Sequence, residues 1–491
     1  MNAAASTIAI GQKPYLPLEP GWWKLPLCYL LTLSLFGLLL LPMAIVSLVF
    51  LAYQWRRDRY NFLIMLTLFW GGFGFWPPEL PWGYLSLTVS TVLWFLLRKP
   101  PILKRTLIAI GAFIAFMFVI AILSVESIKV QIFMMNPYWQ ILYIIIPFAV
   151  FAGQKFEFDI FLHKLMPFAL MIAIFYLLDA YVISGHILLP NDSGNNGSTI
   201  FDPAIHPFSG IIYRIYPTGL YFYALFFIPL LRSYRLRWWQ WGLFIGSLVA
   251  SQTFTIIVGF IATYIVFQGK PKQIFRWGIG GIVFFIGLYF VDGMLPTQIK
   301  GEGNIQSLLR IKSSIDQFFD LFNAVDDEDI AEFGSGRMGQ IIPKLEIVER
   351  EHRELIGLGF LHPKKTTLNQ YIIDNEYYSD IEKAEEVSAI VEVSQVQVYI
   401  QMGWLGLIVV TGLYLYLYCI IRKLPHSYYY LSVCLLNFMW GFGGFAGIYS
   451  SDGCMTIAIA YAAIILSARE ELPGFNCKWL KNRWGLFSPR R

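Results

Sequence analysis

The sequence is poor in charged residues, which make up only 14% of its 491 residues. A soluble globular domain carries about 25% charged residues, so this composition excludes an ordinary soluble fold. Hydrophobic residues reach 57%, and many lie in runs close to the ~20 residues that span a bilayer as a helix. Because backbone inside a membrane must satisfy its own hydrogen bonds, runs of this length have to be helical. The composition therefore predicts an all-α polytopic membrane protein.

Cysteine is also scarce, and the start of the chain lacks a leader-like pattern. Four of the five cysteines stand in apolar runs and one in the C-terminal tail, with no spacing typical of a metal site: Cys28, Cys419, Cys434, Cys454 and Cys477. This pattern excludes a disulfide framework or a zinc site. The first twenty residues have no basic stretch followed by a short apolar core, so we expect no cleaved signal peptide.

The apolar runs set the expected topology. They lie at about 26–55, 60–76, 82–97, 106–125, 133–152, 163–185, 211–231, 241–268, 276–294, 397–421, 428–449 and 453–468. Both ends of 241–268 are basic, which predicts two short helices that enter and leave on one side, broken around Ser251, Gln252 and Thr253. The run 26–55 is either one helix or two short helices hinged at Pro42. The total is about 12–14 transmembrane helices.

Charge is distributed unevenly along the chain, and this orients it. Short clusters of Lys and Arg follow apolar runs near positions 56, 98, 232, 269 and 422, and the C-terminal tail is basic. By the positive-inside rule these clusters are cytoplasmic. Residues 300–392 hold 19 acidic and 10 basic residues, a net charge of −9 that leaves +14 for the rest of the chain. We therefore expect a multi-pass protein of the bacterial inner (cytoplasmic) membrane, with the long loop in the periplasm.

Four parts follow from this topology. Residues 1–294 form an N-terminal transmembrane bundle that includes the short broken hairpin 241–268. Residues 295–396 form the periplasmic loop domain, residues 397–468 form the C-terminal transmembrane helices, and residues 469–491 form a basic cytoplasmic tail.

The long loop contains two predicted helices. Apolar residues recur at helical spacing over 305–322, which predicts an amphipathic helix packed on the membrane side. A second helix is predicted over about 336–356, with Ser335 as its N-cap and Gly357 as its C-terminal stop. On this second helix, His352 lies on the apolar stripe.

Arg337 stands in the first turn of the second helix. A helix N-terminus carries unpartnered N–H groups and about half a positive charge, and an added arginine makes it well suited to phosphate. At 1.5 Å per residue, Arg337 and His352 would lie ~22 Å apart along the axis, so they cannot grip one small group. The charges from Lys344 to Arg353 alternate with glutamates and predict a solvated face, with Arg350 and Arg353 as supporting cations.

Three further ionisable residues stand near membrane entries. Arg214 lies about one turn inside an apolar run, where a charge is costly, so it either faces a cavity or a partner or reaches back to the outer surface. Asp179 is a candidate partner for Arg214, or it reaches the same interface. Glu392 ends the long loop and is expected near the outer interface.

An acidic run in the loop is the nearest approach to a metal motif. Asp327 and Asp329 form a DxD pair, which some sugar-nucleotide enzymes use to hold a divalent cation through carboxylate oxygens. Because the pair is embedded in a longer acidic run, a solvated loop is the simpler interpretation, and no metal site is predicted.

Three short motifs stand in order around the long loop. They are an arginine beside a Pro/Gly pair at the start of a mid-chain helix, an arginine-led helix ending in Gly-x-Gly, and a post-loop helix entry with Gly-x-x-Gly: YRIYPTG, SGRMGQIIPKLEIVEREHRELIGLGF and YIQMGWLG. In motif order and architecture, the chain resembles the superfamily of O-antigen ligases and Wzy-type O-antigen polymerases. The match covers roughly 205–410 in detail. It implies a GT-C-like fold of about 12–14 transmembrane helices with one large, mainly helical periplasmic loop.

The resemblance also implies a reaction. A sugar chain on undecaprenyl diphosphate passes to a hydroxyl, which belongs to another lipid-linked repeat unit in polymerases and to the lipid A core in ligases. Arg214 and Arg337 match the family's arginines and would stabilise the diphosphate leaving group. Glu392, or else His352, would take the acceptor proton. The family is regarded as metal-independent, so no cofactor is expected.

Two departures from the ligase pattern favour a polymerase. Ligases carry a His-Asn pair about eleven residues before the post-loop glycine, where this chain has Glu392 before Gly403. Many members have Ser-Arg in the broken hairpin, where this chain has ASQTFT. The expected partners are undecaprenyl-diphosphate-linked glycans, membrane lipid, and chain-length regulator or export proteins, with no nucleic acid.

Two other classes stay open. A lipid-linked oligosaccharide flippase or solute transporter often shows internal repeats and ionisable residues at mid-membrane, and the sequence has no detectable repeat. A structural subunit of an export complex would tolerate the loss of every charged residue named above.

Overall fold

A computed structural model of the chain describes residues 15, 17–36, 40–71, 93, 104–124, 128–152, 154–183, 188, 225, 234–250, 254–268, 275–276, 337–360, 393–442 and 451–468. Within these residues the elements are helical, apart from one isolated parallel bridge between Tyr15 and Arg235. The all-α class predicted from composition is therefore confirmed for the described part of the chain.

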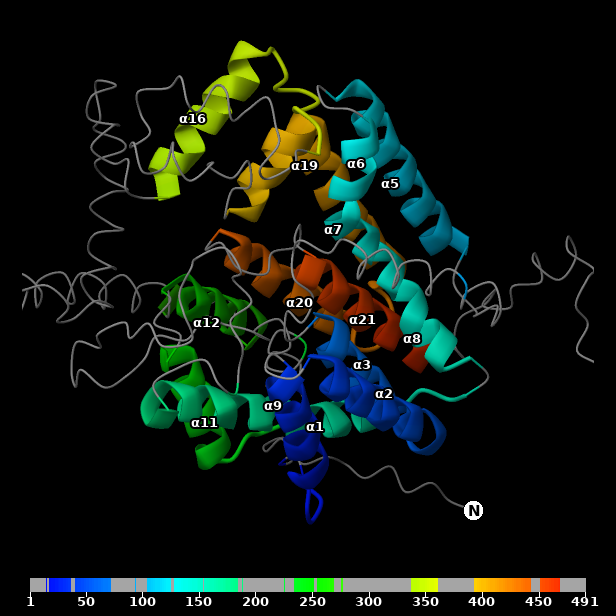
Figure 1. The fold of residues 1–491 in the computed structure, drawn as a ribbon, viewed down its shortest axis with the longest axis vertical. Helices are drawn as coiled ribbons and strands as arrows, with labels where there is room; N and C mark the ends of the chain where they lie inside the picture. The colour runs from blue at the N-terminus through cyan, green and yellow to red at the C-terminus, as the bar shows by residue number, and fades with distance from the viewer. Residues whose placement is uncertain are drawn as a thin grey trace, which may run out of the picture.

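Figure 1 shows the helices as a stack that extends from α1 and α11 at one end to α16 at the other. Their bounds are α1 Lys24–Phe36, α2 Leu40–Arg57, α3 Arg59–Gly71, α5 Lys104–Leu123, α6 Ile128–Met134, α7 Asn136–Trp139, η1 Gln140–Ile144, α8 Ile145–Val150, α9 Phe158–Leu178, η2 Asp179–Ile183, α11 Trp238–Ala250, α12 Phe254–Gln268, α16 Arg337–Arg350, α19 Ser394–Ile421, α20 Ser427–Gly441 and α21 Ser451–Ser467. The element η2 is one turn of π-helix that continues α9.

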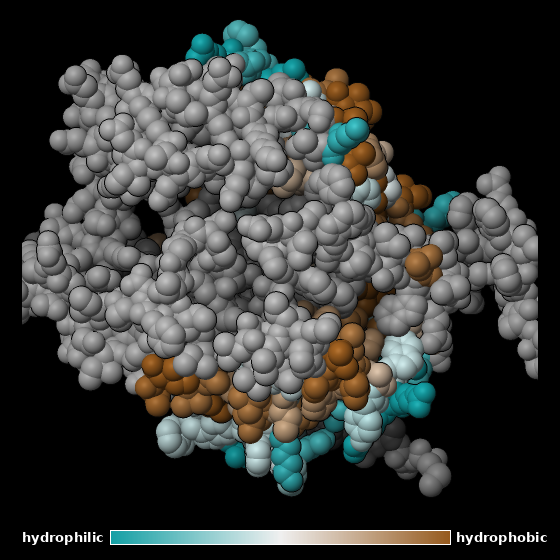
Figure 2. Space-filling view, viewed as in Figure 1, coloured by the Kyte–Doolittle hydropathy of each residue, from teal (hydrophilic) through white to brown (hydrophobic). Residues whose placement is uncertain are grey.

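Three of the described helices, α5, α9 and α19, are long and apolar enough to cross a membrane. Shorter apolar helices of 10–17 residues surround them. On the described surface, apolar residues form a band that meets a polar rim at the lower end, and a second apolar strip follows α5 (Figure 2). Such a band with polar ends fits a protein whose helices lie in a membrane.

The centre of the core is α21, which packs against α20, η1, α8 and α19. It is buried over nearly its whole length. Four of its residues are alanines, which let neighbouring backbones approach closely: Ala458, Ala460, Ala462 and Ala463. Buried tyrosines of α20 complete the packing here, since Tyr430 stacks edge-on against Tyr461 of α21.

Two of the predicted runs are each divided into two helices. The run 26–55 holds α1 and α2, but the break comes before Pro42 rather than at it, because α2 begins at Leu40. A proline in the first helical turn removes an N–H group that has no helical partner there, so the helix continues through it. The run 241–268, expected as two short helices, holds α11 and α12 on either side of residues 251–253, which lie outside the described residues.

Candidate functional site

Helix α19 is broken at Gly403, whose backbone angles (φ 61°, ψ −163°) are not helical. In an unbroken helix, the N–H groups of Trp404 and Leu405 would donate to the carbonyls of Ile400 and Gln401. The break deprives all four groups of their intrahelical partners. Buried backbone groups in this state are costly, so another part of the chain has to satisfy them.

Residues 353–360, here called the clip, supply the four missing partners. Leu358 and Gly359 donate their N–H groups to the two carbonyls before the break, at 2.8 and 2.9 Å. The two N–H groups after the break donate to the carbonyls of Glu354 and Leu355, at 2.9 and 3.0 Å. The clip thus replaces the lost turn of α19 group for group.

Glycine makes this close approach of two backbones feasible. At Gly403, which has a positive φ, a Cβ atom would collide with the backbone of Leu355. At Gly357, also with a positive φ, it would collide with the backbone between Gln401 and Met402. Two of the motifs that carry the resemblance, Gly-x-Gly and Gly-x-x-Gly, therefore meet at one junction.

The N-terminal bundle holds the clip from its other side. Gln131 of α6 is fully buried, and its side-chain amide pairs with the backbone of Phe360. Its Nε2 donates to the carbonyl at 2.9 Å, and its Oε1 accepts the N–H at 2.6 Å. Ser124, just after α5, donates its hydroxyl to the carbonyl of Leu358 at 2.8 Å. The clip is thereby fixed both to α19 and to the 104–150 region.

Two more hydrogen bonds reinforce this junction. The hydroxyl of Tyr138 in α7 donates to Oε1 of Gln401 at 2.7 Å, and both side chains are buried. Nη1 of Arg353 donates to the carbonyl of Leu123, the last residue of α5, at 2.9 Å. A cation at a helix C-terminus interacts favourably with the helix dipole, so Arg353, expected as a supporting cation, serves here as a cap for α5.

Helix α16 packs beside the part of α19 that precedes the break; these two segments (337–350 and 394–402) are here called the lobe. Its interior is an apolar cluster that also includes one clip residue and the residue before α19: Ile341, Ile347, Val348, Leu358, Val393 and Ile400. Lys344 is only 1% exposed, so the expectation of a solvated face from Lys344 onward is wrong at its first member. Lys344 lies one turn from the buried residues Ile341 and Val348, which places it on the packed side of the helix.

The two helices of the lobe run in the same direction, with both N-termini at the end away from the clip (Figure 1). Arg337 is the first residue of α16 and lies one turn before the buried Ile341. At the same end, Gln395 in the first turn of α19 donates its side-chain N–H to the carbonyl of Phe438 in α20, at 2.9 Å. The positive ends of two helix dipoles therefore lie together above the end of α20.

His352 is placed differently from its prediction. Helix α16 ends at Arg350, not near 356, and His352 follows it in a left-handed conformation (φ 52°). The N–H of His352 bonds the carbonyl of Glu349, and the N–H of Arg353 bonds that of Val348. This pattern is a Schellman motif with His352 at the position usually taken by glycine. His352 is exposed there, so it does not lie on an apolar stripe.

The other candidates divide between described and undescribed residues. Arg214, Glu392 and the acidic run at 326–329 lie outside the described residues, as do the runs 211–231 and 276–294 except for a residue or two of each, and the helix predicted over 305–322. Arg350 is exposed at the end of α16.

Asp179 is fully buried where α9 passes into η2. Both of its carboxylate oxygens accept the N–H of Leu188, at 3.0 and 3.1 Å. In this position the carboxylate is the hydrogen-bond acceptor for a backbone N–H group beyond the end of its own helix.

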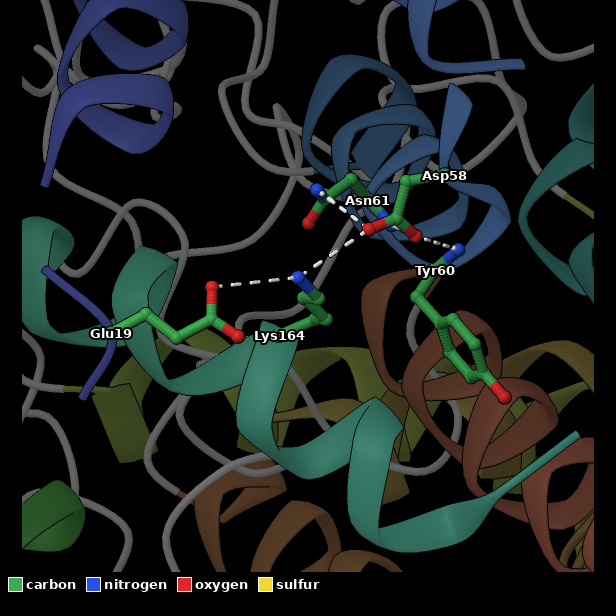
Figure 3. A network of polar contacts seen from close by, with 5 residues as sticks. All are labelled: Glu19, Asp58, Tyr60, Asn61 and Lys164. Carbon is green, nitrogen blue, oxygen red and sulfur yellow. Dashed lines mark hydrogen bonds and ion pairs between the residues drawn. The ribbon is translucent and has the colours of Figure 1, made fainter. Parts of the chain in front are cut away.

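A second polar network lies at the other end of the molecule, around the basic cluster near position 56 (Figure 3). Asp58 caps α3 by accepting the N–H groups of Tyr60 and Asn61, at 2.9 and 3.2 Å. Lys164 of α9 forms ion pairs with Asp58 at 3.6 Å and with Glu19 at 4.0 Å. The network ties the N-terminal segment, α3 and α9 together.

Two aromatic titratable groups lie close to this network. Burial, reinforced by a hydrogen bond to Asp159 at 3.1 Å, raises the pKa of Tyr234 to about 12. Burial lowers the pKa of His426, against the opposing influence of Asp159. The His426 ring stacks on Phe158 with centroids 4.3 Å apart. Both effects favour the neutral side chains at this packed corner.

The residues that anchor the clip have only a weak signal in the sequence. Gln131 and Gln401 are uncharged polar residues within strongly apolar segments, where an amide has to find a buried partner. Ser124 and Tyr138 carry no comparable signal, because hydroxyls are common at helix ends. Among the described residues, no group of three His, Cys, Asp or Glu side chains is placed to hold a metal ion.

Comparison with protein-family models, with curated proteins and with solved structures gives no match for the chain.

Proposed function

We propose that the protein is a membrane glycosyltransferase that polymerises undecaprenyl-diphosphate-linked oligosaccharide repeat units at the periplasmic face of the inner membrane. The observation that carries the proposal is the lobe. In it, the arginine-led helix and the Gly-x-x-Gly helix entry, two of the three motifs of the resemblance, pack as one unit. Their N-termini lie at the same end, next to α20.

The chemistry of such a transfer fits this end of the lobe. The leaving group is a lipid diphosphate, so charge develops on phosphate oxygens in the transition state. Preorganised positive ends of helices and arginines stabilise charge of this kind. Arg337 begins α16 at this end, and Arg214 is its proposed partner on the same diphosphate.

The acceptor hydroxyl needs a base, and Glu392 is the first candidate. Glu392 directly precedes Val393, a member of the apolar cluster that also holds Ile341, one turn after Arg337. A glutamate with an ordinary pKa of ~4.3 is ionised at neutral pH and can accept a proton without further tuning. His352 is the second candidate, but its exposed position after the end of α16 places it at the far end of that helix from Arg337.

The test is a strain that lacks this protein, complemented with variants. Loss of the protein should leave single repeat units on the acceptor instead of long chains. Arg337→Ala and Arg214→Ala should each reproduce that loss while the variant still inserts at normal levels. Arg422→Ala is the matched control, since Arg422 is an exposed cation at the opposite end of α19. Normal chain lengths in both arginine variants would overturn the proposal.

Two other results would replace it by a different function. Accumulation of unattached polymer would indicate a ligase that transfers chains to the lipid A core. Trapping of repeat units on the cytoplasmic side would indicate a transporter. A purified protein that loses all activity with EDTA would contradict the metal-independent scheme and return attention to the acidic run at 326–329.

A further inference from the structure

Gln131 is the one described side chain of α6 that joins the clip to the N-terminal bundle by paired hydrogen bonds. Both polar atoms of its amide are used on a single residue, Phe360. Gly359 makes room for it, because a Cβ at that position would contact Oε1 of Gln131 and collide with Ser124. The ring of Phe360 also packs edge-on against Tyr138 of α7, with centroids 5.6 Å apart. Residues 359 and 360 of the clip are thus contacted from α6, from α7 and from the end of α5.

The residue that packs into the lobe is close in sequence to Phe360. Leu358, two residues before Phe360, bonds the carbonyl of Ile400 and packs in the apolar cluster of the lobe. A displacement of Phe360 therefore shifts Leu358, and with it the register between α16 and the first part of α19. Helix α16, which has 14 residues, and the turn that follows it connect the Arg337 end of the lobe to the clip.

We propose that Gln131 is a positioning residue, which sets the lobe, and thereby the Arg337 end of α16, over the membrane helices. Gln131 touches no substrate in this scheme; it acts through Phe360, the clip and α16. The effect of Gln131 on catalysis rests on the proposed transfer reaction. The effect of Gln131 on the placement of the lobe is independent of that reaction.

The chemistry of the contact offers a matched pair of variants. In Gln131→Glu, a protonated carboxyl keeps one acceptor for the N–H of Phe360 and one O–H donor for its carbonyl, as the amide does. An ionised carboxylate is an acceptor only and would face that carbonyl without a proton. Burial and the carbonyl both favour the protonated form. Gln131→Glu should therefore behave as the wild type at low pH and fail as pH rises, whereas Gln131→Leu should fail at every pH.

Charged groups on α6 and the clip also influence the ionisation of a carboxyl at position 131. Among the described residues they are Lys129, exposed on α6, and Arg353 and Glu354 of the clip. The guanidinium of Arg353 is engaged by the carbonyl of Leu123. Wild-type protein, with a neutral amide at position 131, supplies the baseline for their titration at each pH.

The experiment uses the full chain in lipid nanodiscs at pH 5, 7 and 9. Amide hydrogen exchange of the segments 353–360 and 400–406 is compared with the wild type at the same pH. Transfer from a synthetic undecaprenyl-diphosphate-linked repeat unit gives kcat and KM in parallel. Gln154→Glu is the control, because Gln154 is exposed in a turn.

The expected result has three parts. Gln131→Leu exchanges both segments at least ~10-fold faster at every pH, and its kcat falls by ~100-fold with KM changed less than about threefold, since misplacement by about 1 Å can cost that much. Gln131→Glu matches the wild type in exchange and kcat at pH 5. At pH 9 it exchanges as fast as Gln131→Leu and has the same reduced kcat. The control follows the wild type throughout.

Three outcomes overturn the inference. The first is wild-type exchange and kcat in Gln131→Leu. The second is normal kcat despite faster exchange, which would make Gln131 an anchor without a positioning role. The third, which keeps the test decisive if Gln131→Leu does not fold, is Gln131→Glu without any restoration at pH 5. A wild type that transfers no sugar would refute the proposed function instead, and the exchange measurements would still decide whether Gln131 sets the lobe.

Discussion

Substitution of Gly403 by alanine tests the junction at its most constrained point. The residue has a positive φ with an extended ψ, a region that is open almost only to glycine. An added Cβ would also collide with the backbone of Leu355. The chain then has two ways to respond: it can keep the break under strain, or it can release the clip and straighten α19.

The energies of the two routes are similar. Keeping the break costs about 1–3 kcal/mol of backbone strain, and moving Leu355 away weakens the two hydrogen bonds after the break, about 2 kcal/mol in total. Releasing the clip loses two of the four hydrogen bonds net, about 2 kcal/mol, because a straight α19 regains the other two. It also exposes Leu358 and Phe360, which costs about 3 kcal/mol or more. The chain takes the cheaper route, which is to keep the break, so Gly403→Ala should destabilise the protein by about 3–5 kcal/mol.

Gly412→Ala in the same helix is the matched control. A Cβ at Gly412 meets nothing within 4 Å, and alanine is the better helix former by about 1 kcal/mol. The assay is denaturant unfolding of both purified variants in one detergent, with wild type alongside. If Gly403→Ala unfolded at the same denaturant concentration as Gly412→Ala, the interpretation of the clip as a substitute helical turn would be refuted.

Two further predictions concern the opposite end of the molecule. Asp58→Ala should lower the unfolding free energy by about 1–2 kcal/mol through loss of the α3 cap, with the partly exposed ion pair to Lys164 adding less than the cap. Asp58→Asn, which keeps the cap, should lose less than half of that in the same denaturant assay. The lowered pKa of His426 means that its neutral form is favoured in the fold, so its contribution to stability is present above the unfolded pKa of ~6.5 and is lost as pH falls below it. His426→Asn, which tolerates the positive φ of 62°, should remove that part of the acid sensitivity, and an unchanged pH dependence of the melting midpoint would contradict the assignment.

The parts of the fold that could be predicted are those with local causes. A serine at position 335 and an apolar stripe predict a helix from about residue 336, and α16 begins at Arg337. The glycine at position 357 predicts a later end for the same helix, which in fact stops at Arg350. His352 takes the left-handed position instead, and Gly357 serves the close approach to α19. Residue type alone cannot distinguish a glycine that ends a helix from one that lets two backbones meet.

The break in α19 could not be predicted, because its cause is not local. Gly403 and Gly412 stand in equally apolar surroundings of one predicted helix, yet only Gly403 is non-helical. The difference is that groups of the clip, more than 40 residues earlier in the chain, form hydrogen bonds with the residues on both sides of Gly403. Hydropathy therefore gives one long span where the structure has a short helix of the lobe followed by the membrane helix.

The structural role of the motif glycines affects how the motifs should be interpreted. Without any ligand, Gly357 and Gly403 are accounted for by the close backbone contact between the clip and α19, and Gly359 by the room that Ser124 and Gln131 need. Loss of activity on their substitution would therefore follow from misplacement of the lobe and would identify no catalytic group. The described packing of α16 rests on Ile341, Ile347 and Val348, so these apolar residues, rather than the motif's arginine, position the helix. The chemical evidence must come from Arg337, Arg214 and Glu392, with the glycine variants as the control for misplacement.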